Sequence, residues 1–250
     1  MPRYFLEVAY KGTSFKGFQS QLNGPTIQGE INNVLQTLLR VPILTTTSSR
    51  TDAGVHAQQN FLHADIDAAL TRKFIYNANS ILHDDVFIRN IYEVNDNAHA
   101  RFDALSRSYQ YRIVHNKNPF EKEFAYFFPF QIHLDLLQAS SQILLETKDF
   151  TSFAKRHSDV NNHICTLSKA SWHYNGNVLI FEVTGNRFLR GMVRALVATS
   201  LQVARGNISL HDLQVIIEAK DCSKADFSAE AKGLFLQAVE YPNDLFKNNV

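Results

Sequence analysis

The stretch HICTLSKASWHYNGNVLIFEVT, residues 163–184, carries the strongest short-range structural signal in the chain. Two strand-like runs, 163–174 and 177–184, flank the dipeptide Asn175-Gly176. An Asn-Gly pair between such runs is typical of a tight β-hairpin, because both residues tolerate the positive φ that the turn requires. The stretch therefore predicts two antiparallel strands joined by a two-residue turn.

Helices and further strands are expected on both sides of this hairpin. Apolar residues at helical spacing predict helices over 27–40, 71–81, 134–146, 187–204 and 209–219. Short β-branched or alternating runs predict strands over 4–10, 43–47, 61–66, 86–94, 107–114 and 234–241. Helices mixed with largely antiparallel strands predict the α+β class. We expect two similar halves with a seam near residues 95–105, and domains over 1–100 and 101–250.

Local signals refine three of these helices. Thr26 is expected to cap the first one. Ser209 followed by Asp212 resembles a capping box for the last one. In the helix predicted over 187–204, the arginines recur at positions that share one face, and they are Arg187, Arg190 and Arg194.

Composition restricts the class of protein. The 250 residues are 45% hydrophobic and 20% charged, which excludes a disordered chain. No run of about 18 apolar residues is present, so we expect no membrane-spanning helix, and the first residues do not resemble a secretory signal. The two cysteines, Cys165 and Cys222, exclude a disulfide framework. These features predict a soluble, cytoplasmic protein.

The charge balance bears on nucleic-acid binding. Lysine and arginine number 25 and aspartate and glutamate 24, which gives a net charge of +1. A nucleic acid would therefore have to bind a local basic patch rather than the whole surface. Basic residues do gather along the chain, in the groups Arg101, Arg107 and Arg112, then Lys155 and Arg156, then Arg187, Arg190 and Arg194. Each group is also compatible with an ordinary solvated surface.

The segment Ser49-Arg50-Thr51-Asp52-Ala53-Gly54-Val55-His56-Ala57 combines an acid, an arginine and a glycine within five residues. It lies between two predicted strands. Gly54 permits a positive φ or the close approach of a ligand. The same residues could also form a plain turn in which Asp52 caps its own backbone, so spacing alone leaves both interpretations open.

This loop resembles the signature Arg-Thr-Asp-x-Gly-Val-His of the TruA-type tRNA pseudouridine synthase family. Further segments resemble that family in the same order along nearly the whole chain. They are Tyr10-Lys11-Gly12 with Gly17 to Gln21 and Thr26 to Gln28, His99 to Ala104 with Arg107 to Tyr111, Asp149 to Phe153, Phe188 to Arg194, and Gly233 to Leu236. Agreement in order across these segments is far more specific than any single loop.

The resemblance implies an enzyme that isomerises uridine to pseudouridine in the anticodon stem-loop of tRNA, at positions 38–40. It also implies a central RNA-binding cleft between the two halves and a homodimer that pools two basic clefts. The reaction imports no group and oxidises nothing. A cofactor-free enzyme without a metal agrees with the lack of a P-loop, a Rossmann glycine fingerprint or a zinc-type Cys/His spacing.

The resemblance also assigns roles to residues. Asp52 would be the nucleophile, since a carboxylate can form a covalent intermediate and leave again. Arg194 would keep that carboxylate ionised, Tyr109 would stack on the target base, and Leu234 would line the uracil pocket. The remaining residues are expected to contact RNA, and they are Arg50, Arg101, Lys155, Arg156 and Arg190. The face of the predicted strand that carries Tyr109 suits a surface facing a cleft, and it also holds Arg107, Tyr111 and Ile113.

Three positions depart from the family pattern, namely Phe18, where Trp is frequent, Ser49, where Gly is common, and His83, where Pro is frequent. Two alternatives remain. A tRNA-binding relative without catalysis would share most of these motifs, although intact Asp52, Tyr109 and Arg194 argue against it. A metal hydrolase could draw on His56, His63, Asp65, His83, Asp84 and Asp85, but no pair among them has a known zinc spacing.

Overall fold

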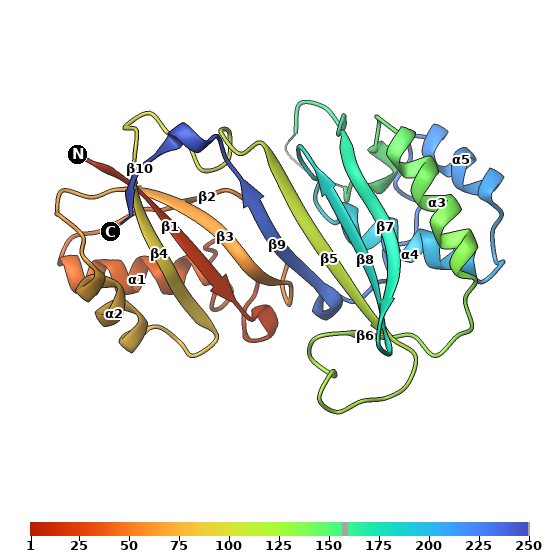
Figure 1. Cartoon of the computed structure of the whole chain (residues 1–250), viewed down its shortest axis with the longest axis horizontal. Coiled ribbons are helices and arrows are strands. Elements are labelled where there is room, and N and C mark those ends of the chain that lie inside the picture. The colour runs from red at the N-terminus through yellow and green to blue at the C-terminus, as the bar shows by residue number, and fades with distance from the viewer. Residues whose placement is uncertain (157–159, 250) are drawn as a thin grey trace. The chain divides into compact units, whose positions relative to one another are not determined.

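The computed structural model (Figure 1) describes residues 1–156 and 160–249. The chain divides into two compact units. Unit 1 consists of Met1–Ser106 together with Leu236–Val250, and unit 2 consists of Arg107–Phe235. Unit 1 is therefore discontinuous in sequence, and unit 2 is continuous.

Unit 1 is built on an antiparallel sheet. Its strands are β1 (Arg3–Tyr10), β2 (Thr46–Thr47), β3 (His56–Asp65), β4 (Val86–Val94) and β10 (Phe246–Asn249). The order across the sheet is β10-β4-β1-β3, and β2 pairs with β3. The register places Tyr10, the last residue of β1, opposite both Ala57 and Val86. The end of β1 thus lies where β3 and β4 begin.

Two helices pack in unit 1, α1 (Ile27–Leu39) and α2 (Arg72–Ile81). Thr26 caps α1 by accepting a hydrogen bond from the Gly29 N–H, 3.2 Å, as the sequence predicts. The buried side of α1 consists of Ile27, Ile31, Val34 and Leu35, which recur at helical spacing. A 3-10 turn, η1 (Gly12–Ser14), follows β1.

An aromatic cluster ties the C-terminal segment into unit 1. The Tyr241 ring meets the rings of Phe5 and Phe61 edge-on, with centroids 5.3 and 5.2 Å apart. The rings of Tyr92 and Phe246 lie 5.0 Å apart. Such pairs add about 0.5–1.5 kcal/mol each beyond their buried area. The cluster therefore fastens residues 241–246 to strands β1, β3 and β4.

Unit 2 combines a second antiparallel arrangement with three helices. Its strands are β5 (Ser106–Val114, of which only Ser106 belongs to unit 1), β6 (Tyr126–Phe127), β7 (Leu167–Asn175) and β8 (Val178–Gly185). Its helices are α3 (Leu134–Glu146), α4 (Met192–Ala204) and α5 (Leu210–Glu218). The order is β5-β8-β7, and the short β6 runs parallel to β5. Strand β9 (Leu234–Glu240) begins in unit 2 and ends in unit 1. The 3-10 turns here are η2 (Thr151–Phe153) and η3 (Ala231–Gly233), and η4 (Asn243–Leu245) belongs to unit 1.

Several sequence predictions are confirmed. The hairpin forms, but its two-residue turn is shifted by one position. Asn175 is the last residue of β7 and lies opposite Val178, so the turn consists of Gly176, at a φ of +57°, and Asn177. The box of Ser209 and Asp212 caps α5, and α3 and β4 have the predicted bounds. The α+β class with largely antiparallel strands is also confirmed. No helix of the described residues is long and apolar enough to cross a membrane.

Other predictions are wrong at the level of elements. The run 43–47 forms a strand only at Thr46–Thr47, and β3 begins at His56 rather than at Phe61. Strands β6 and β10 were not predicted. Helix α4 begins at Met192 instead of 187, because Gly191 in front of it adopts a φ of +73°. Arg187 and Arg190 therefore lie outside the helix and do not share a helix face with Arg194.

Candidate functional site

The Asp52 loop, defined as residues 48–55, connects β2 to β3. The Val55 N–H donates to the Asp52 carbonyl oxygen, 3.1 Å, which closes a tight turn. Gly54 occupies the third position of this turn with a φ of +79°, which glycine adopts without the steric penalty of other residues. The Asp52 side chain is half-buried and the Arg50 side chain is exposed. The loop thus presents a carboxylate from a turn that only a few residue types can form.

Two glycines of the N-terminal segment allow its backbone to lie directly against this loop. A Cβ atom on Gly12 would lie 2.0 Å from the Val55 carbonyl oxygen, and one on Gly17 would lie 3.1 Å from the Thr51 carbonyl oxygen. The Phe18 N–H donates to that same Thr51 oxygen, 3.0 Å. Larger side chains at positions 12 and 17 would therefore push the loop away from its support.

A network of buried hydrogen bonds connects the Asp52 loop to strands β1 and β3. Asn60 on β3 is fully buried, and its Nδ2 donates to the Ser49 carbonyl oxygen, 3.0 Å, and to the Tyr10 Oη, 3.2 Å. Its Oδ1 accepts a hydrogen bond from the Ser48 Oγ, 2.7 Å. The Tyr10 hydroxyl and the Thr51 Oγ1 share a further hydrogen bond of 2.8 Å. Fully paired polar groups of this kind fix one conformation, since breaking any bond leaves a buried group unsatisfied.

The histidines of the metal-hydrolase alternative have structural partners. His56 Nδ1 accepts a hydrogen bond from the Gly12 N–H, 3.2 Å, and His63 Nδ1 accepts one from the Ala100 N–H, 3.1 Å. Burial, with a smaller contribution from the neighbouring His99, lowers the pKa of His63 to about 4. Among residues 1–156 and 160–249, no group of three or more His, Cys, Asp or Glu side chains could hold a metal ion.

Tyr109 lies on β5 of unit 2, opposite Val183 of β8. Its ring meets the edge of the Phe188 ring, with centroids 4.9 Å apart, and its side chain is half-buried. The other residues that were expected on an open face are buried, namely Arg107, Tyr111 and Ile113. The Nη1 of Arg107 donates a hydrogen bond to the Asn186 carbonyl oxygen, 2.9 Å. The prediction that this strand face is open is therefore wrong except at Tyr109.

Arg194 lies in the first turn of α4. Its Nε donates to the Ala229 carbonyl oxygen, 2.7 Å, and its charge counteracts the rise that burial causes in the pKa of the Tyr111 phenol. Gly191 provides no side-chain cap, and this first turn contains no acid. A helix N-terminus already carries partial positive charge. The arrangement therefore concentrates positive potential at this end of α4, which is suited to an anion.

Leu234 is buried at the start of β9. A Cβ atom on the preceding Gly233 would lie 2.9 Å from the Arg112 carbonyl oxygen and from the Tyr111 ring. Glycine at position 233 thus lets β9 begin in close contact with β5. The guanidinium of Arg112 then stacks 4.2 Å above the ring of Phe235.

The predicted RNA-contacting cations are distributed over both units. In unit 2 the Lys155 N–H donates to the Arg190 carbonyl oxygen, 2.9 Å, so two exposed basic residues lie side by side. Arg156 follows at once and is also exposed. In unit 1 the exposed Arg101 lies over the Phe102 ring at 5.6 Å. Lys155 and Arg190 are thus neighbours in unit 2. Arg50, Asp52 and Arg101 belong to unit 1.

The residues that hold the loop are not predicted from the sequence as functional residues. Tyr10, Gly12 and Gly17 lie in a segment that resembles the family, but the resemblance gives them no role. Asn60 lies in none of the motifs. A signal was present, because Asn60 shares a strand face with Leu62 and Ala64, which are both buried. A polar residue on the core face of a strand indicates a buried hydrogen-bond network.

Comparison with known proteins adds independent findings. A family described as tRNA pseudouridine synthase matches residues 141–242. A protein named tRNA pseudouridine synthase A from Azobacteroides pseudotrichonymphae is 41% identical over 249 residues, covering 99% of this chain and 100% of the relative. Proteins of the same name from Parabacteroides distasonis and Staphylococcus aureus are 39% and 33% identical, covering 98% of this chain and 98% and 95% of the relatives.

Proposed function

The chain belongs to the tRNA pseudouridine synthase family, and from this premise we propose that Asp52 is the nucleophile of its uridine isomerisation. The enzyme breaks the bond between N1 of uracil and C1′ of ribose and forms a bond between C5 and C1′. The proton that leaves C5 is balanced by one gained at N1. No electron is transferred and no group is imported, so the protein's own side chains must supply the chemistry.

The observation that supports Asp52 most strongly is the rigid construction of its loop. A half-buried carboxylate is presented by a turn that buried hydrogen bonds and two close glycine contacts hold in place. Preorganisation of this kind is what a reacting group requires, because misplacement by about 1 Å can reduce the rate about 100-fold. Attack on C1′, attack on the base and removal of a sugar proton all need this carboxylate in its ionised form.

We assign supporting roles to three residues of unit 2. Arg194, at the N-terminal end of α4, would supply a positive charge to the reacting carboxylate and orient it through charge-assisted hydrogen bonds. Tyr109 would stack on the target uracil with the exposed part of its ring. Leu234 would line the uracil pocket. These roles follow the family resemblance, and the half-buried states of Tyr109 and Arg194 are compatible with them.

Substrate binding is proposed to rely on exposed cations. Lys155, Arg156 and Arg190 form one basic group in unit 2, and Arg50 and Arg101 add cations in unit 1. Such residues contact phosphates and position RNA without reading its sequence. We propose that the target uridines lie in the anticodon stem-loop and are flipped out of the stack, which costs a few kcal/mol. We further propose a cytoplasmic homodimer, since symmetric dimers are the commonest oligomers.

The deciding experiment is tritium release from tRNA that carries uridine labelled at C5. The wild type should release tritium and Asp52→Asn should not, although this variant should still bind tRNA in a filter assay. Asp67→Asn is the matched control, since Asp67 is an exposed carboxylate of the same unit. Turnover by Asp52→Asn at the wild-type rate would refute the assignment. Binding without release by the wild type would instead identify a non-catalytic tRNA-binding relative.

A further inference from the structure

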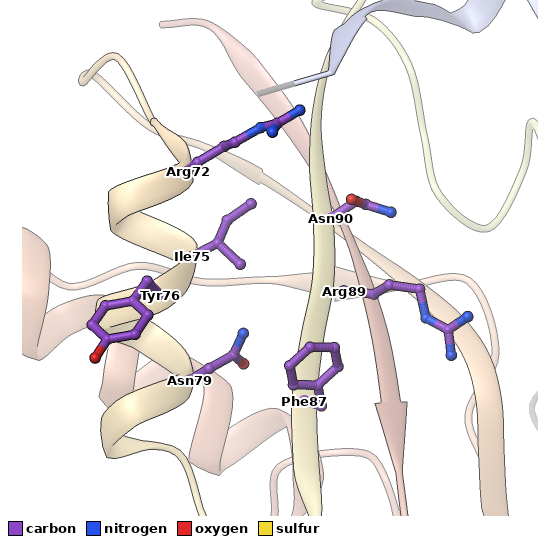
Figure 2. A pocket seen from close by; sticks show the side chains of 7 residues that line it. All are labelled: Arg72, Ile75, Tyr76, Asn79, Phe87, Arg89 and Asn90. Carbon is purple, nitrogen blue, oxygen red and sulfur yellow. The ribbon is translucent and has the colours of Figure 1, made fainter.

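A surface pocket of about 400 Å³ lies between α2 and β4 of unit 1, and its lining shares no residue with the Asp52 loop. The side chains that line it are Arg72, Ile75, Tyr76, Asn79, Phe87, Arg89 and Asn90. Figure 2 shows the first four on α2 and the other three on β4.

Two exposed aromatic rings contribute to this pocket. Tyr76 is 73% exposed and Phe87 is 50% exposed, although aromatic side chains normally contribute to a core. Ring faces left open to solvent beside a pocket are suited to stacking with a planar partner. Stacking of a nucleic-acid base on an aromatic side chain is worth about 1–3 kcal/mol and tolerates any base.

The charge of the pocket favours a polyanion. Its lining contains two arginines and no acidic residue. Arg89 donates to the Gln58 carbonyl oxygen, 3.0 Å, and lies 3.9 Å from the buried Glu7 carboxylate. Arg72 makes no hydrogen bond or ion pair with any residue in the described part of the chain, so its guanidinium is available to a phosphate.

The pocket is closed to a peptide strand at its centre. A peptide could add to the edge of β4 only through free backbone groups. The Ile88 N–H donates to the Asn79 Oδ1, 2.8 Å, and the Ile88 carbonyl oxygen accepts from the Asn79 Nδ2, 2.8 Å. Asn79 therefore occupies this edge and at the same time fixes α2 against β4. The ligand must be recognised by side chains, which again favours a nucleotide.

We propose that the pocket between α2 and β4 binds a nucleotide of the tRNA substrate away from the reacting uridine, with its base against Tyr76, the more exposed of the two rings, and its phosphate at Arg72. The inference rests on the proposed function, because it takes tRNA as the ligand. Its effect would be on substrate affinity. The chemical step would be unaffected, since none of these residues belongs to the catalytic machinery.

The test compares tRNA binding and turnover in Arg72→Ala and Tyr76→Ala with the wild type. We expect the dissociation constant for tRNA to rise about tenfold for Tyr76→Ala, which corresponds to loss of one stacked base. For Arg72→Ala the slope of log K against log salt concentration should fall by about one, as for loss of one phosphate contact. The kcat of both variants at saturating tRNA should equal that of the wild type.

Lys73→Ala is the matched control, because it removes the same charge from the same exposed helix turn without touching the pocket lining. A direct measurement accompanies it. Photo-crosslinking with tRNA that carries 4-thiouridine should label the peptide that contains Tyr76. Tyr76 and Arg72 are exposed, so the thermal midpoints of both variants should match that of the wild type.

The outcomes separate this inference from the proposed function. If both variants bind tRNA with wild-type affinity and salt dependence, and no crosslink forms at the pocket, the nucleotide pocket is overturned. If the wild type still isomerises tRNA in that case, the proposed function stands. A change in sedimentation of Tyr76→Ala with unchanged tRNA affinity would show a protein-binding surface and would also overturn it. A wild type that neither binds nor isomerises tRNA would overturn the proposed function itself, and the nucleotide pocket with it.

Discussion

The Asp52 loop and helix α4 each position a charged residue, yet they do so by opposite means. The loop is held by directional hydrogen bonds among buried polar groups, chiefly those of Asn60 and Tyr10. Helix α4 is held by burial, since nearly all of its residues are buried and its N-terminus has no side-chain cap. Within the described residues, the buried side-chain polar atoms without a partner are those of Ser141, Trp172 and Ser200, all in unit 2.

The two kinds of interaction control different properties, namely the orientation of a side chain and the stability of the fold. Hydrogen bonds fix orientation, because they weaken steeply when their angles change. Apolar burial stabilises without fixing direction. Changes around the loop should therefore affect catalysis more than stability, whereas changes at the buried apolar positions of α4 should affect stability more than catalysis.

Leu201→Ala should produce the largest effect, on stability. Leu201 is buried in α4, two turns beyond Arg194, and such truncations lower the free energy of unfolding by about 2–5 kcal/mol. Urea denaturation followed by circular dichroism measures this loss. The kcat at a temperature where the variant is folded should stay within about twofold of the wild type. A large loss of kcat would contradict the expectation that apolar burial in α4 controls stability rather than catalysis.

Gly12→Ala should mainly reduce kcat. The added Cβ would meet the Val55 carbonyl oxygen at 2.0 Å, so the Asp52 loop must shift, and we expect a loss of about 100-fold, or about 2.7 kcal/mol in the activation barrier. Tritium release measures the rate. Urea denaturation measures how far the added methyl group lowers the free energy of unfolding. Gly206→Ala is the control. Gly206 has a φ of +74°, so alanine there strains the backbone, but its Cβ atom would meet no other atom within 4 Å and the position is far from the Asp52 loop in sequence. Equal losses of kcat in both variants would refute the loop as the cause.

Tyr10→Phe should have a smaller effect on stability. It removes the hydroxyl that pairs with Thr51 and Asn60, which lowers the free energy of unfolding by about 1 kcal/mol. The kcat should nevertheless fall by more than the loss of stability alone implies, since the orientation of the loop is relaxed. Comparing urea denaturation with tritium release for this one variant gives both quantities. A variant with full activity would show that Asn60 alone orients the loop.

The pH dependence of unit 1 should give the smallest change. The pKa of the folded His63 is about 4, below its ordinary value of 6.5, chiefly because of burial. Between these values the unfolded chain binds a proton that the folded chain does not, so stability present above pH 6.5 is lost as pH falls toward 4. We expect a loss of about 0.7 kcal/mol from pH 7 to pH 6, measured by urea denaturation. An equal slope in His63→Asn would assign the dependence to other groups.

The elements that the sequence predicts well are those with local signals. Helix α5 has its capping box, α1 has Thr26, and the hairpin has Asn175-Gly176. Each signal acts through hydrogen bonds or steric limits within a few residues, so it can be recognised without knowledge of the rest of the fold. The start of α4 differs from the prediction because the sequence around Gly191 does not reveal that this glycine adopts a φ of +73° and so precedes the helix.

The candidate site divides in the same way. The turn around Asp52 and Gly54 is a local feature, and the sequence predicts it together with the family resemblance. The support from Asn60, Tyr10 and Gly12 depends on contacts between residues far apart in the chain, which no periodicity reveals. Strand β10 was missed for the same reason, since its pairing with β4 joins Asn249 to Tyr92. The roles of Asp52, Tyr109, Arg194 and Leu234 stay predictions until the variants are measured.

The discontinuity of unit 1 has a consequence for the order of events during protein synthesis. Residues 1–106 leave the ribosome first, but Tyr241 and Phe246, whose rings complete their aromatic cluster, emerge only after all of unit 2. Translation proceeds at about 5–20 residues per second, so the nascent N-terminal sheet waits several seconds with its aromatic face uncovered. Unit 2, which is continuous, can fold on the ribosome in the meantime. We therefore expect chaperones that shield exposed aromatic surface to bind the nascent N-terminal segment until the last strands appear.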